Sequence, residues 1–170
     1  HNSVLLKESV DGLDIKPGGV YVDVTFGGGG HSKEILKRLG PNGTLLAFDQ
    51  DTDALDNAID DSRFTLINEN FRFLKRFLRF HNITQVDGIL GDFGVSSHQF
   101  DVAERGFSTR FEANLDMRMN QDSDFSAFDV INKYEESRLK SVLVEYGELR
   151  TAGGMARLIV EARANGAIKS

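Results

Sequence analysis

Over the first 95 residues, short runs of β-branched and aromatic residues alternate with stretches whose apolar positions recur with a helical period. The short runs predict strands at 20–26, 44–49, 64–68 and 86–92, and the periodic stretches predict helices at 32–39, 52–60 and 71–80. This alternation is typical of parallel strands joined by right-handed helical crossovers. We therefore expect a Rossmann-like α/β core with a parallel sheet in the order 3-2-1-4.

The pattern changes after residue 95, where no further strand is predicted. Residues 125–166 alternate between short helical patterns and glycines, with one apolar face around Val130 and Tyr134 and another around Leu139 and Leu143. Between the two parts, residues 100–124 form a connector rich in charged residues. The sequence therefore predicts two parts, a core at 1–105 and a connector with helices at 106–170.

The predicted sheet is incomplete on one side. In folds of this order a fifth strand normally covers the outer side of strand four, and none follows residues 86–92. We therefore expect the chain to be an N-terminal fragment of a longer protein. A second expectation is that copies of the chain associate through this uncovered apolar edge.

Composition excludes several classes of protein. The 170 residues include no cysteine, so disulfides and thiolate metal sites are excluded, and no His, Asp and Glu spacing predicts a metal site. No run of about 18 apolar residues and no signal peptide is present, so we expect a cytoplasmic protein that does not bind membranes. The net charge of −6 argues against an extended surface for duplex nucleic acid.

One local stretch, FRFLKRFLRFHN at 71–82, is basic in spite of that balance. Phe73, Phe77 and Phe80 share a helical face with two leucines, which predicts ordinary packing against the core. The four cations between them then form a solvated face. Contact of that face with RNA is the less favoured interpretation.

The strongest pattern is VYVDVTFGGGGHSKEIL at 20–36, where a strand meets a helix through four glycines. Such a turn brings backbone N–H groups close to a nucleotide-like ligand. A phosphate-binding P-loop is excluded because no lysine follows the last glycine. A dinucleotide fingerprint is damaged, since Ser32 stands where its third glycine belongs. The remaining interpretation is a methyltransferase turn, with Asp23, Gly27 and Gly29 at alternate positions.

The acidic residues of the two strands favour the methyltransferase interpretation. Asp23 can receive the ammonium group of S-adenosylmethionine directly or through water, whereas a carboxylate there would repel a pyrophosphate. Asp49 ends the second strand, where an acid binds ribose hydroxyls in both ligand families. The structural alternative is that these two aspartates only form turns or cap helices.

Four motifs together, DVTFGGGGHS, GDFGVSSHQFD, ERGFS and LDMRM, resemble the bacterial ribosomal RNA cytosine-N4 methyltransferases of the RsmH (MraW) family. The resemblance implies a class I methyltransferase core with an inserted helical domain, S-adenosylmethionine as cofactor, and the decoding region of small-subunit rRNA as substrate. Two departures are Phe93, where the family usually has leucine, and the N-terminal His1-Asn2-Ser3-Val4-Leu5, which lacks the family's proline.

The resemblance also implies roles for individual residues. Gly29, Gly30 and His31 would line the methionine part of the cofactor, although His31 beside a glycine turn can equally cap the helix. Asp49 would bind the ribose and Phe71 would pack on the adenine. The pocket would be completed by Asp92, which is also the candidate catalytic residue, and by Gln99.

In the connector, the resemblance favours contacts with the RNA substrate. Arg105 and Arg118 could bind phosphates, and Phe107 could stack on the target base. Ser108 would also contact the substrate. The residues alone leave an equal alternative, in which Arg118 pairs with Asp116 and Phe107 fills the core.

Three functions remain open at this point. The first is an rRNA methyltransferase, of which this chain carries the N-terminal portion. The second is a module that binds cofactor or RNA without turnover. The third is an NAD-dependent oxidoreductase, against which Ser32 and Asp23 argue.

Overall fold

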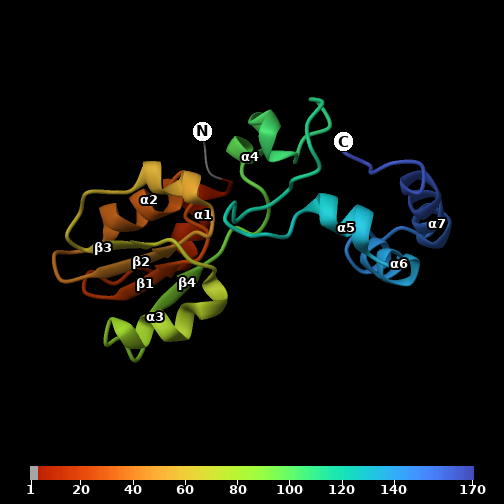
Figure 1. The fold of residues 1–170 in the computed structure, drawn as a ribbon. Coiled ribbons are helices and arrows are strands. Elements are labelled where there is room, and N and C mark those ends of the chain that lie inside the picture. Colours follow the sequence, from red (N-terminus) through yellow and green to blue (C-terminus); the bar gives the residue numbers. More distant parts are fainter. Residues whose placement is uncertain (1–3) are drawn as a thin grey trace. The chain divides into compact units, whose positions relative to one another are not determined.

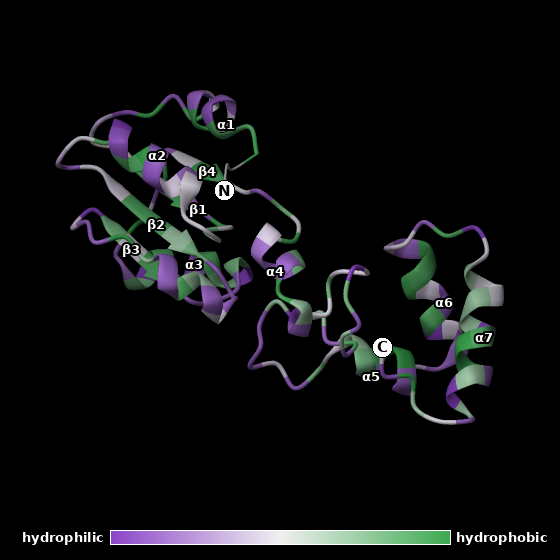
Figure 2. Cartoon of the chain, turned by 90° about the horizontal axis from the view of Figure 1, so that it is seen from above, coloured by the Kyte–Doolittle hydropathy of each residue, from purple (hydrophilic) through white to green (hydrophobic). Residues whose placement is uncertain are grey.

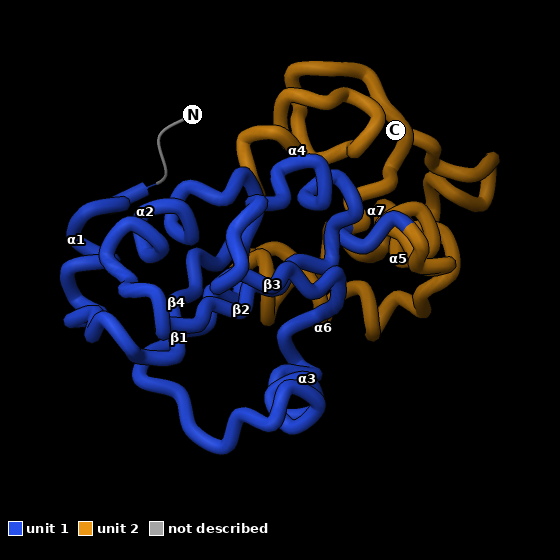
Figure 3. The backbone as a smooth tube through the Cα atoms, turned by 90° about the vertical axis from the view of Figure 1, so that its left-hand side faces the viewer, with its two compact units in different colours: residues 1–94, 119–121 blue, residues 95–118, 122–170 orange. Residues whose placement is uncertain are grey.

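The computed structural model describes residues 4–170, so the first three residues of the N-terminal motif lie outside the described part. The chain forms two compact units (Figure 3). The first unit contains the residues up to Gly94 together with Met119–Gln121, and the second contains Val95–Arg118 and Asp122–Ser170. The first unit thus ends before the expected boundary at residue 105. It also includes three residues of the connector, Met119–Gln121.

The first unit is built on a parallel sheet whose order, β3-β2-β1-β4, is the predicted one. The four strands fall within the predicted ranges and are shorter at their ends: β1 Val20–Asp23, β2 Thr44–Phe48, β3 Phe64–Ile67 and β4 Gly88–Leu90. In β1, Tyr21 pairs with Leu45 of β2 and with Gly88 of β4. All four carboxyl ends therefore point to the same edge of the sheet.

Helices cover both faces of this sheet (Figure 1). Helices α1 (Leu6–Gly12) and α2 (Gly30–Arg38) lie on one face, and α3 (Leu74–Phe80) lies on the other. Alternation along β1 explains the two layers, because Tyr21 packs with α1 and α2 whereas Val22 packs toward α3. Both side chains are fully buried.

The connections correct several expectations. The helix expected at 52–60 is a short 3₁₀ helix, η1 (Thr52–Asn57), and another, η2 (Phe71–Phe73), leads into α3. The acid-rich sequence of η1 offers few apolar positions to hold a longer helix against the core. Phe80 was expected on the apolar face, but its side chain is 78% exposed. Helix α1 was not predicted.

The second unit is helical, as expected. Its elements are α4 (Ser97–Asp101), η3 (Ala103–Arg105), α5 (Ala127–Lys133), α6 (Glu136–Glu145) and α7 (Ala152–Arg163). Helices α6 and α7 pack against each other around Leu139, Ala152 and Ala156, which are buried. Reciprocal hydrogen bonds of 2.8 Å between Asn132 and Ile168 hold the C-terminal segment near α5.

Strand β4 is an edge strand among the described residues, since it pairs with β1 alone. Its Ile89 is 49% exposed. Self-association through this edge stays a prediction. None of the helices within 4–170 combines the length and apolar character needed to cross a membrane.

Candidate functional site

The candidate site lies where the carboxyl ends of β1, β2 and β4 meet, and the glycine turn between β1 and α2 is its centre. Gly27 and Gly29 have φ angles of +50° and +74°, a region that residues with a Cβ rarely adopt. A Cβ at Gly29 would come within 2.9 Å of the Phe26 ring, so this glycine is also required by packing. A Cβ at Gly27 or Gly28 would meet no atom within 4 Å. One side of the turn is therefore open, and its backbone can be approached closely.

Asp23 fixes this turn from beneath. Its side chain is fully buried, and its two oxygens accept hydrogen bonds from Ser32 Oγ at 2.7 Å and from Thr25 N at 3.1 Å. Burial raises the pKa of Asp23, and the Ser32 hydroxyl acts in the opposite direction. With no exposed surface, Asp23 ties the end of β1 to the start of α2 and offers a ligand no direct contact in this conformation.

Asp49 joins the glycine turn to the end of β2. Its Oδ2 accepts from Gly27 N at 2.8 Å, and its Oδ1 accepts from Asp51 N at 2.9 Å. Asp49 is partly exposed, and it stands beside the open side of the turn.

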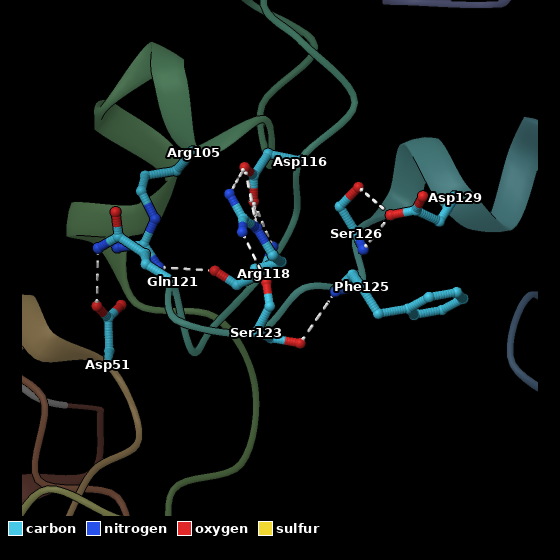
Figure 4. Close-up of polar contacts among 9 residues, drawn as sticks. All are labelled: Asp51, Arg105, Asp116, Arg118, Gln121, Ser123, Phe125, Ser126 and Asp129. Carbon is cyan, nitrogen blue, oxygen red and sulfur yellow. Dashed lines mark hydrogen bonds and ion pairs between the residues drawn. The ribbon is translucent and has the colours of Figure 1, made fainter.

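The loop after β2 is held by polar side chains from two other places in the sequence. From the end of β3, Asn68 Nδ2 donates to Asp49 O at 2.9 Å, and Asn70 Nδ2 donates to Gln50 Oε1 at 2.8 Å. From the segment Met119–Gln121, Gln121 Nε2 donates to Asp51 Oδ1 at 3.4 Å, as Figure 4 shows. It also donates to Asp53 Oδ1 at 3.1 Å. These contacts order the acidic edge around Asp49.

Two aromatic rings flank the same edge. Phe71, at the start of η2, is 40% exposed, and Phe93, after β4, is 73% exposed. Their ring centroids lie 5.6 Å apart at an interplanar angle of 56°. Both rings thus retain exposed surface, which stacking on a planar base requires.

Asp92 and His31 are two further predicted site residues that lie in the first unit. Asp92 is exposed, and its backbone N donates to Thr25 Oγ1 at 2.7 Å, which places it beside the residue that also bonds Asp23. His31 lies in the first turn of α2, is buried, and its Nε2 lies 3.1 Å from Val4 O. The N-cap residue of α2 is Gly29, and no side chain forms a capping hydrogen bond at this end of the helix.

The other predicted residues lie in the second unit. Gln99 is buried and forms a capping box with Ser96 at the start of α4. Arg105 is buried and donates to Arg118 O at 2.9 Å, while Phe107 is partly buried.

Arg118 and Ser108 have defined partners within the connector. The Arg118 guanidinium donates to the Asp116 carboxylate from two nitrogens, the shortest distance being 2.6 Å, and it also donates to Ser123 O at 2.7 Å (Figure 4). It lowers the pKa of Asp116. Ser108 Oγ accepts from Arg110 N at 3.2 Å. The structural ion pair considered as the alternative for Arg118 is therefore present.

The first unit thus brings together most of the predicted cofactor residues: Asp23, Gly27, Gly29, Gly30, His31, Asp49, Phe71 and Asp92. Sequence analysis missed the side chains that organise them, above all Thr25 and Ser32. Both stand inside the DVTFGGGGHS motif, so their position next to the glycines was the available indication. Gln50, Asn70 and Gln121 could not be found in this way, because their partners are distant in sequence.

Comparison with known proteins gives one consistent result. A model of the MraW methylase family matches residues 1–170. A ribosomal RNA small subunit methyltransferase H of Christiangramia forsetii is 70% identical over all of this chain and 56% of its own length. Proteins of the same name in Flavobacterium johnsoniae and Bacteroides thetaiotaomicron are 71% and 56% identical, with the same coverage. The chain spans a little over half the length of these relatives.

Proposed function

Since this chain belongs to the MraW methylase family, we propose that it carries the S-adenosylmethionine site of an enzyme that methylates small-subunit ribosomal RNA. The proposed target is the N4 amino group of a cytidine in the decoding region. The observation that carries the proposal is the open glycine turn tied to Asp49. The names of the relatives support the choice of substrate.

The residues present fit the proposed cofactor. The ligand is cationic, and Asp49 and Asp92 place carboxylates just after the carboxyl ends of β2 and β4. The open backbone at Gly27 and Gly28 gives room for the amino-acid part, and His31 and Gly30 begin the adjoining helix. Asp49 would accept the ribose hydroxyls, and Phe71 would pack on the adenine.

When bound, S-adenosylmethionine supplies an electrophilic methyl group on a sulfonium. The cytosine N4 lone pair is delocalised into the ring, so the protein must position the base and accept the amino hydrogens as the nitrogen changes geometry. We assign this acceptor role to Asp92, because its carboxylate is exposed and its backbone is anchored to the glycine turn through Thr25.

The RNA substrate is proposed to meet residues of the second unit as well. The target base must leave its stack before it can reach such a site. Arg105, Phe107 and Ser108 are the proposed contacts, and Gln99 the proposed completion of the cofactor pocket. Arg118, whose guanidinium is engaged by Asp116 and Ser123, is proposed to act by ordering the connector. The enzyme would work in the cytoplasm, with its rRNA.

Calorimetric titration with S-adenosylhomocysteine, with NAD as the control ligand, tests the cofactor site. We expect saturable binding of the first ligand only. Binding of NAD instead would favour the oxidoreductase interpretation. Binding of neither S-adenosylhomocysteine nor NAD would overturn the proposal for this chain.

Asp92→Ala separates catalysis from binding. In the full-length protein, methyl transfer to small ribosomal subunits should be lost while S-adenosylhomocysteine binding is kept. Loss of both would make Asp92 a cofactor ligand. Binding without any turnover in the unaltered full-length protein would favour a non-catalytic binding module.

A further inference from the structure

Helix α3 and the preceding η2 present one face to the core and one to solvent. Leu74, Phe77 and Leu78 pack into the cluster around β1 and β2. The opposite side carries four exposed cations, which we call the basic face: Arg72, Lys75, Arg76 and Arg79. Their spacing of three and four residues places them on one side of the helix, and Figure 2 shows the alternation of hydrophilic and hydrophobic residues along α3.

The basic face is isolated from acidic side chains. Residues 71–86 hold four of the 20 lysines and arginines of the chain and none of its 26 acids. Within the described part of the chain, no ion pair involves any of the four. Elsewhere in the same unit, Arg38 pairs with Asp11 and Glu34, and Arg63 pairs with Asp61. Arg72 lies over the Phe73 ring, 4.6 Å from its centroid. Among the described residues, single cations such as Lys7 and Lys33 also lack an ion pair, so what distinguishes this helix is that four such cations share one face.

This arrangement opposes helix stability. Arg72 and Arg76, and likewise Lys75 and Arg79, are like charges four residues apart, a spacing that destabilises a helix. Arg72 and Lys75 also lie near the helix N-terminus, where the macrodipole disfavours cations. Acidic residues would keep the helix equally soluble without these costs. A polyanion bound along the face would offset them.

An exposed aromatic residue continues the same side of the helix. Phe80, four residues after Arg76, is 78% exposed, and its ring meets the His81 ring edge-on at 5.2 Å. Cations that follow a backbone, combined with an aromatic ring on which a base can stack, are typical of surfaces that bind single-stranded nucleic acid.

We propose that the basic face of α3, with Phe80, binds the backbone and one base of single-stranded RNA next to the methylation target. This inference rests on the proposed function. The basic face begins one residue after Phe71, so RNA bound there leads directly to the candidate site. From Arg72 to Arg79 the helix rises roughly 10 Å, which matches about three stacked nucleotides.

The test measures the salt dependence of binding of the full chain to a fluorescein-labelled single-stranded RNA of mixed sequence. In the variant Lys75→Gln/Arg76→Gln/Arg79→Gln, the slope of log K against log salt should fall by about 2, and affinity at 0.1 M salt should fall about a hundredfold. Phe80→Ala should weaken binding about tenfold without changing the slope. The control Lys7→Gln/Lys37→Gln/Lys140→Gln removes the same charge from other exposed positions and should keep the parent slope.

Equal slopes for the α3 variant and the control would overturn the inference. So would tighter binding of the parent to vesicles rich in phosphatidylglycerol than to RNA, with the same loss in the α3 variant. Thermal unfolding and titration with S-adenosylhomocysteine on every variant separate this outcome from failure of the proposed function. If the parent binds cofactor and RNA but the α3 variant loses nothing, only the role of α3 is wrong. If the parent binds neither ligand, the proposed function itself fails.

Discussion

The hydrogen bond between Ser32 and Asp23 joins the end of β1 to the start of α2 across the glycine turn. Replacing Ser32 by alanine removes a 2.7 Å bond from a hydroxyl to a fully buried carboxylate, whose other oxygen accepts from Thr25 N at 3.1 Å. A hydrogen bond to a buried charged group is worth about 2 kcal/mol. In a chain of this length that loss corresponds to a fall in Tm of roughly 4–8 °C.

The loss of stability in Ser32→Ala should depend on pH, and the burial of Asp23 decides whether the loss grows or shrinks as pH rises. Burial raises the folded-state pKa of Asp23 above its ordinary value of 3.8. Between these two pKa values the folded state binds more protons than the unfolded state, so the contribution of Asp23 to stability falls as pH rises through that window. Ser32 lowers the raised pKa by donating to the ionised form. Without Ser32 the folded-state pKa of Asp23 rises further, so stability is lost over a wider pH range. The loss of stability in Ser32→Ala should therefore be small near pH 4 and larger at neutral pH.

Thermal unfolding followed by circular dichroism between about pH 4 and 8 measures this difference. Ser141→Ala is the matched control, since Ser141 is exposed on α6 and its hydroxyl bonds only Ser137 O of the same helix, at 3.2 Å. A Tm loss in Ser32→Ala no larger than in Ser141→Ala, or one that is constant with pH, would refute the assignment of Asp23 as the buried anchor. Affinity for S-adenosylhomocysteine should fall together with Tm, because the same bond shapes the turn.

Three further predictions follow from the same geometry. Asp49→Asn cannot accept from both of its backbone donors with the strength of a carboxylate, so calorimetry should show affinity for S-adenosylhomocysteine weakened about 10–100-fold; unchanged affinity would remove Asp49 from the site. Gly29→Ala should cost about 1–3 kcal/mol in urea unfolding, because its φ is +74° and the new Cβ would lie 2.9 Å from the Phe26 ring. Gly154→Ala, an open position inside α7, should instead be neutral or stabilising by up to about 1 kcal/mol, and equal effects of the two would contradict the strain argument. Self-association through β4 should appear in light scattering as a concentration-dependent mass that Ile89→Lys abolishes, whereas a monomer at every concentration would rule it out.

The sheet and the glycine turn could be predicted from sequence because both depend on local patterns. Strands such as β1 are short apolar runs bounded by turn residues, and the left-handed φ angles at Gly27 and Gly29 leave a direct mark on residue choice. Asp49 could be found for the same reason, since it follows a strand at a fixed place in the βαβ unit. Its carboxylate indeed reaches the glycine turn, at Gly27 N.

Features that depend on tertiary contacts were not predictable in the same way. Periodicity placed Phe80 on the buried face of its helix, but Phe80 is the last residue of α3 and its side chain is 78% exposed. The same periodicity gave no means to see that Asp23 is enclosed rather than presented to a ligand. That depends on Ser32, which follows four glycines and turns back toward β1.

The segment Met119–Gln121 shows why a boundary drawn from composition does not coincide with the limits of the two compact units. Asp49, Asp51 and Asp53 stand within five residues of one another, and their mutual repulsion favours an open loop. Gln121 donates to the last two of these carboxylates, and Gln50 donates to Met119 Sδ at 3.5 Å. A chain cut at residue 105 would keep every residue of the glycine turn yet lose the donor Gln121 and the acceptor Met119. The acidic stretch from Asp49 to Asp53 therefore belongs to a compact unit that also includes Met119–Gln121, a segment far from it in the linear sequence.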